Sequence, residues 1–116
     1  MSRRSTSVLL NDIRDHAREA VAFAQHKSRA DIAADRLLEL ALTRLLEIIG
    51  EAASHIPKQD QLRYRQIPWT QIISLRNRLI HGYDSVDLDI LWQIVTSDLP
   101  PLIAALDTIL SSKSPE

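Results

Sequence analysis

The stretch that decides the fold is LLELALTRLLEIIGEAA, residues 37–53. Its apolar residues recur at intervals of three and four, which is helical spacing, and they cover more than one stripe of the helix. A helix that is apolar on two sides needs two neighbours, so we place it at the centre of a bundle. We expect it to run from about Asp31 to His55 and to end before Pro57, which disfavours helix in the preceding residue.

Gly50 lies inside this helical pattern. A glycine in the middle of a helix costs about 1 kcal/mol relative to alanine. We therefore expect a second backbone, from another helix or another subunit, to approach closely at this point.

Helical spacing also covers the chain on either side. We predict a first helix from Ser5 or Ser7 to about Lys27, with either serine as its N-cap. A connector over 57–60 and a short turn or helix over 61–66 follow the central helix.

Three further helices are expected after Pro68, over 68–82, 87–97 and 102–110. Gly82 is predicted as a left-handed C′ cap, and Pro100-Pro101 should kink or break the last helix. Because the connectors are short, the pattern favours an all-α, up-down bundle of four to five helices.

The composition limits the protein to a few classes. Its 116 residues support one domain, placed at 1–110, with a polar tail over 111–116. Two glycines are too few for a β-sandwich or a Rossmann unit, and the absence of cysteine excludes disulfides and thiolate metal sites. No apolar run approaches the ~20 residues of a membrane span, and we expect no signal peptide and a cytoplasmic location.

The net charge of −1 argues against a nucleic-acid partner, but the charge is unevenly distributed. Residues 60–83 contain four Arg against one Asp, a net charge of +3, whereas residues 84–116 contain six acidic residues against one Lys, a net charge of −5. Arginine suits bidentate phosphate contacts, although charge alone favours an ordinary solvated helix face.

The basic segment contains RNRLIHGY, residues 76–83. Histidine can act as a general acid and base near neutral pH, arginine can hold a phosphate, and asparagine can orient either group. This set suffices for RNA cleavage by the RNA's own 2′-OH, which needs no metal. The spacing alone favours the simpler interpretation, a capped helix end with solvated arginines, because an arginine five residues before a histidine is common by chance.

Helical geometry limits how these side chains can meet. Asn77 and His81 are four residues apart and should share a helix face. Arg76 and His81 are five apart, about 140° around an ideal helix. They can meet if the Arg76 side chain wraps round, if the helix unwinds at Gly82, or across a two-fold interface between two copies.

The sequence resembles the HepT-like toxins of the HEPN superfamily over about residues 8–110. The resemblance rests on separate blocks in a fixed order, namely LEIIGEAA (46–53), IPW (67–69), LRNRLIHGY (75–83), VDLD (86–89) and DLP (98–100). It implies an all-helical homodimer that cleaves RNA without a metal or cofactor, with the Arg-Asn-x-x-x-His motif at the dimer cleft. Arg76 and His81 would then be catalytic, and Asn77 supportive.

The resemblance also implies a type VII-like toxin–antitoxin system. The antitoxin would be a small nucleotidyltransferase, encoded nearby, that transfers AMP to Tyr83. The adduct would add negative charge and bulk two residues from His81, and could thereby repel RNA phosphate.

Several other residues have two interpretations each. Arg63, Arg65 and Arg78 are candidate RNA contacts or solvated arginines, and Tyr64 could stack on a base or pack at a subunit contact. Trp69 and Trp92 could be base-stacking platforms, but they fit apolar helix faces and are predicted to be core residues.

Two histidine–acid pairs have the spacing of metal ligands, Asp12 with His16 and Glu51 with His55. A stable site needs more ligands, so exposed helix pairs are the simpler interpretation. Glu51 could pair with an arginine of the basic segment or be a plain surface acid.

Two other functions fit the same residues. The protein could be a non-catalytic helical subunit that presents the Arg/Tyr segment to a nucleotidyltransferase. It could also be a plain RNA-binding domain whose binding depends on salt but not on His81.

Overall fold

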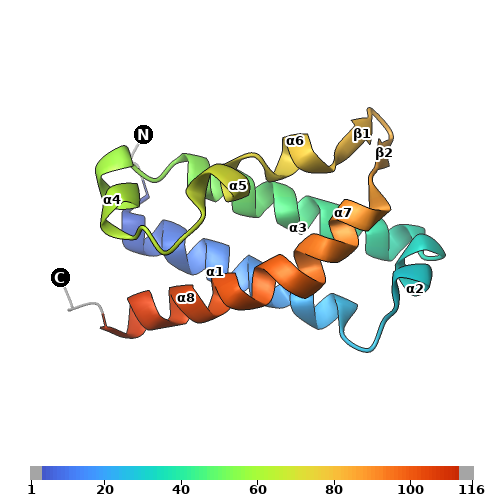
Figure 1. Cartoon of the computed structure of the whole chain (residues 1–116), viewed down its shortest axis with the longest axis horizontal. Coiled ribbons are helices and arrows are strands. Elements are labelled where there is room, and N and C mark those ends of the chain that lie inside the picture. Colours follow the sequence, from blue (N-terminus) through green and yellow to red (C-terminus); the bar gives the residue numbers. More distant parts are fainter. Residues whose placement is uncertain (1–3, 113–116) are drawn as a thin grey trace.

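The computed structural model describes residues 4–112, apart from the side chain of His81. Three long helices follow its long axis (Figure 1). The elements in chain order are α1 (Thr6–Ala24), α2 (Arg29–Ala33), α3 (Arg36–Ser54), α4 (Lys58–Arg63), α5 (Trp69–Ile73), α6 (Leu75–Leu79), β1 (Ile80–Gly82), β2 (Ser85–Val86), α7 (Leu88–Gln93), the π-helix η1 (Ile94–Asp98) and α8 (Leu99–Ser112). The predicted all-α class is confirmed, with one short hairpin added to it.

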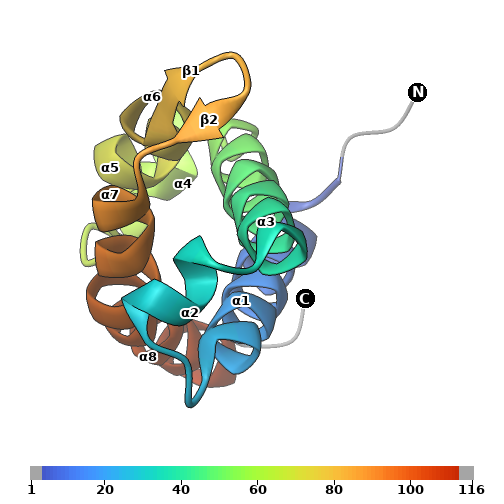
Figure 2. The ribbon, with the colours of Figure 1, turned by 90° about the vertical axis from the view of Figure 1, so that its right-hand side faces the viewer.

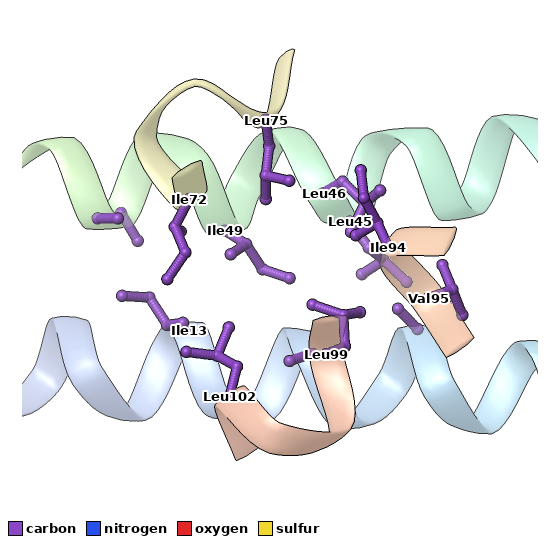
Figure 3. Packing of buried hydrophobic residues seen from close by; sticks show 14 of the residues in the cluster. Ile13, Leu45, Leu46, Ile49, Ile72, Leu75, Ile94, Val95, Leu99 and Leu102 are labelled. Carbon is purple, nitrogen blue, oxygen red and sulfur yellow. The ribbon is translucent and has the colours of Figure 1, made fainter. Parts of the chain in front are cut away.

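The predicted central helix, α3, packs between α1 and the α5–α6 segment, as its two apolar sides require. Seen end-on, α1, α3, α7 and α8 surround a common interior, and α2 lies at one end of it (Figure 2). Ile13, Ile49 and Leu99 reach this interior from three different helices (Figure 3). No described polar side chain is buried, so the core is held by apolar burial alone.

The prediction of one helix from Asp31 to His55 is wrong at its N-terminal end. Asp35 begins a new helix, because its side chain accepts a hydrogen bond from the Leu38 N–H at 3.1 Å. Before it, Ser28 and Asp31 form a capping box around α2. The hydrogen bond from the Ser28 backbone N–H also lowers the pKa of Asp31 from its ordinary value.

The first helix begins as predicted, with Ser5 as its N-cap. It ends at Ala24, earlier than Lys27, because Gln25 turns to an extended conformation. The short turn or helix predicted over 61–66 is a helix, α4, which begins earlier, at Lys58, inside the predicted connector, and ends at Arg63.

The last helix is not broken at Pro100-Pro101. It widens instead, since the Leu99 N–H donates to the Ile94 carbonyl five residues earlier, which makes η1 a π-helix. Prolines lack an N–H and crowd the carbonyl one turn before them, and a wider turn just ahead of them relieves that conflict. The helix continues through Ser112, past the predicted end of the last helix at residue 110.

The helical run Leu88–Ser112 is long and apolar enough to cross a membrane by length and composition. Core helices meet the same criterion, and one third of its most apolar window is buried. Its buried residues, among them Leu102 and Leu106, pack against α1 and contribute to the core.

Candidate active site

The RNRLIHGY segment changes from helix to hairpin in its middle. Arg76 and Asn77 lie on α6, which ends at Leu79, and Ile80 is extended with ψ 124°. His81 lies in β1, which pairs antiparallel with β2. The prediction that Asn77 and His81 share a helix face is therefore wrong, because no helix continues to His81.

Gly82 is not a left-handed helix cap, since it belongs to β1 and its φ is not positive. The hairpin is closed by pairing between Ile80 and Val86 and by a hydrogen bond from the Asp87 N–H to the Leu79 carbonyl at 2.9 Å. The Leu79 carbonyl therefore accepts a hydrogen bond from across the hairpin instead of from a further turn of helix.

Gly50 positions α5 and α6 against α3. A Cβ at Gly50 would lie 3.1 Å from the Ile72 carbonyl oxygen, so the two backbones meet closely here and any larger residue would require the neighbouring backbone to shift. The expected close approach is confirmed, and the second backbone comes from the same chain. The two short helices are separated at Ser74, whose hydroxyl donates to the Thr70 carbonyl at 2.7 Å.

Arg76 points into solvent beside the long helix α3. Its side chain is 74% exposed, and its Nε lies 3.8 Å from Oε2 of Glu47. The other carboxylate oxygen of Glu47, Oε1, lies 3.5 Å from Nη1 of Arg44. One carboxylate thus contacts two guanidinium groups at the surface.

The other motif residues differ in exposure. Asn77 is exposed. Arg78 is half-buried, and its Nη2 lies 3.4 Å from Oδ2 of Asp98 at the end of η1. Tyr83 is fully exposed in the turn between β1 and β2. The side chain of His81 lies outside what the structure describes.

The other candidate RNA contacts lie at α4, far along the molecule from β1 and β2 (Figure 1). The guanidinium of Arg63 lies 5.4 Å from the ring centroid of Tyr64, and also pairs with Asp60 at 3.7 Å. Tyr64 packs against the core, while Arg65 is exposed. Within one copy the structure does not bring these residues to the 76–83 segment.

In each of the two predicted histidine–acid pairs, the histidine contacts the acidic residue one helical turn before it. Glu51 contacts His55 at 3.0 Å rather than an arginine of the basic segment. The Nδ1 of His16 contacts the Asp12 backbone carbonyl at 2.6 Å, not its carboxylate. Within the described part of the chain no three metal-ligating side chains come together.

Trp69 is buried as predicted, and Trp92 is half-buried.

Sequence reasoning missed Glu47. Its spacing from Arg44 marks an ordinary i,i+3 ion pair within α3. Only the packing of α6 against α3 brings it to Arg76, which is 29 residues later in the chain.

Comparison with known proteins places the chain among ribonucleases. It matches the family "Ribonuclease HepT-like" over residues 13–109. A protein of Methanocaldococcus jannaschii named "Putative RNase" is 33% identical over 102 residues. These residues cover 88% of this chain and 94% of that protein's length. A protein of Thermococcus cleftensis named "Probable ribonuclease HepT" is 35% identical over 100 residues, 86% and 91% of the two chains. No solved structure matches the chain at a significant level. The chain therefore belongs to the HepT-like ribonuclease family.

Proposed function

We propose that the protein is a metal-independent endoribonuclease that acts as the toxin of a toxin–antitoxin pair in the cytoplasm. The observation that carries this proposal is Arg76, exposed on α6 five residues before His81, in a chain of a ribonuclease family. An exposed guanidinium and a histidine five residues later supply a phosphate ligand and a proton-transfer group on one short segment.

In the proposed reaction the imidazole of His81 accepts the proton of an RNA 2′-OH. The 2′-oxygen then attacks the adjacent phosphorus, the bond from phosphorus to the 5′-oxygen breaks, and that oxygen takes up a proton. The products are a 2′,3′-cyclic phosphate and a 5′-OH end. Arg76 neutralises charge on the phosphate, and Asn77 orients the reacting groups.

We propose that the active form is a homodimer. The outer face of α3 supports this, because it exposes Leu37 and Leu40, whose side chains are 80% and 48% exposed, near Arg44. Large apolar side chains side by side on one helix face are typical of a protein–protein contact. A two-fold pairing through this face would bring two copies of the basic segment to one cleft.

Tyr83 is the proposed point of control by a nucleotidyltransferase antitoxin. Its phenol oxygen would attack the α-phosphorus of ATP, releasing pyrophosphate and a proton and leaving AMP on the tyrosine. The full exposure of Tyr83 at the tip of the hairpin supports access by a second enzyme. The added phosphate would repel RNA close to His81.

His81→Ala tests the nuclease directly. We expect it to abolish cleavage of single-stranded RNA and growth arrest while leaving the circular dichroism spectrum unchanged, because it removes the proton-transfer group. Cleavage by the unaltered protein should persist in EDTA and yield cyclic phosphate ends. Cleavage that survives in His81→Ala, or that needs a metal, would contradict the mechanism.

Binding experiments distinguish the alternatives. Tight binding of a nucleotidyltransferase with RNA left intact would favour a non-catalytic subunit. Salt-dependent RNA binding without cleavage would favour a plain RNA-binding domain.

A further inference from the structure

Glu47 has a place in the site that neither the family match nor the motif assigns. It lies in the middle of α3, and its two carboxylate oxygens contact different arginines, Arg44 within the same helix and Arg76 on α6. We infer that Glu47 is a positioning residue, which holds the guanidinium of Arg76 in the orientation that grips RNA phosphate. This inference rests on the proposed ribonuclease activity.

The first argument is conformational entropy. The Arg76 side chain is 74% exposed, and free arginine side chains have about 2 kcal/mol of rotamer entropy. A group that stabilises a transition state must be held close to its productive geometry. The ion pair with Glu47 is the contact that the described residues provide for this purpose.

The second argument concerns the Arg76 nitrogen that forms the ion pair with Glu47. Glu47 approaches Arg76 at Nε, which leaves the two terminal nitrogens for a bidentate contact with phosphate. At 3.8 Å the contact is an ion pair rather than a hydrogen bond. Its effect therefore depends on the negative charge of Glu47.

The third argument is the charge balance. Arg44, Glu47 and Arg76 together have a net charge of +1, so the cluster still attracts phosphate while Glu47 offsets the repulsion between the arginines. Exposed ion pairs contribute at most about 1 kcal/mol to stability. Removing the charge should therefore affect the placement of Arg76 and not the fold.

The test is Glu47→Gln, with Glu39→Gln as its matched control. Glu39 lies on the same helix and pairs with Arg36 at 3.4 Å with the same i,i+3 spacing, but it has no contact with Arg76. Two quantities are measured in both variants. The first is the NMR order parameter of the Arg76 Nε–H group, whose signal is assigned because it disappears in the Arg76→Lys variant. The second is the kinetics of RNA cleavage.

In Glu47→Gln we expect the order parameter to fall and kcat to fall by up to about fivefold, because an ion pair worth at most about 1 kcal/mol can bias the placement of Arg76 by no more than that factor. KM should not rise, since the local positive charge increases. Glu39→Gln should change neither quantity. A merely structural role would not separate kcat from KM in this way.

An unchanged order parameter, an unchanged kcat or faster cleavage in Glu47→Gln would each overturn the inference. Faster cleavage would mean that Glu47 competes with RNA for Arg76. If the unaltered protein does not cleave RNA, the proposed function has failed, whereas the order parameter still decides whether Glu47 holds Arg76.

Discussion

At the residue scale, Gly50 shows how far a single position can be interpreted from sequence. A glycine within a strong helical pattern indicates a close approach, and that expectation is confirmed. The sequence does not identify the approaching atom, which is the Ile72 carbonyl oxygen of α5. The same limit applies to the acids of α3, where Glu47 rather than Glu51 meets Arg76.

Gly50→Ala should lower the free energy of unfolding by about 1 kcal/mol. The better helix propensity of alanine contributes about 1 kcal/mol, but forcing a methyl group against a carbonyl oxygen 3.1 Å away costs about 1–3 kcal/mol. Gly50→Val should cost more. Urea unfolding measures both, with the exposed Ser54→Ala as a control that changes little. A stabilised Gly50→Ala protein would contradict the close packing.

At the scale of elements, the β1–β2 hairpin is the main departure from the predicted helices. Leu79 and Ile80 continue the apolar spacing of the preceding helix, so nothing local marks its end at Leu79. The hairpin instead depends on Val86 and Asp87, which pair back to Ile80 and Leu79. The hairpin matters for the proposed function because its turn exposes Tyr83.

Incubation with ATP and the nucleotidyltransferase that we propose as antitoxin should add AMP to Tyr83 and stop RNA cleavage. The exposed phenol is accessible, and the added phosphate repels the substrate. Mass spectrometry of the Tyr83 peptide measures the adduct. Tyr83→Phe should escape modification, whereas Tyr64→Phe, which alters the half-buried second tyrosine, should still be modified. An AMP group on any other residue would contradict this assignment.

At the scale of the whole molecule, the proposed two-fold pairing would explain how a chain with a net charge of −1 can bind RNA. In one copy the four arginines of residues 60–83 lie in two places, at α4 and at the 76–83 segment (Figure 1). Pairing would double the positive charge at the cleft while the rest of the surface stays acidic.

Leu37→Lys combined with Leu40→Lys should convert the protein to a monomer without unfolding it, because both side chains are exposed and the added charges repel across the interface. We expect cleavage to fall at least tenfold with the loss of the shared cleft. Analytical ultracentrifugation and the RNA assay measure the two effects. Val8→Lys, at another exposed apolar position, is the control that should stay dimeric. A dimeric double variant would show that the interface lies elsewhere.

The sequence by itself determined the helical class, a serine N-cap at Ser5 or Ser7, the close approach at Gly50 and the burial of Trp69. These follow from local periodicity, capping chemistry and composition, which depend on residues near each other in the chain. Only the tertiary structure decided where α6 stops, that Arg78 pairs with Asp98 and that Glu47 meets Arg76. Those outcomes depend on contacts between residues distant in sequence, whose relative placement is set by how the helices pack and not by any local pattern.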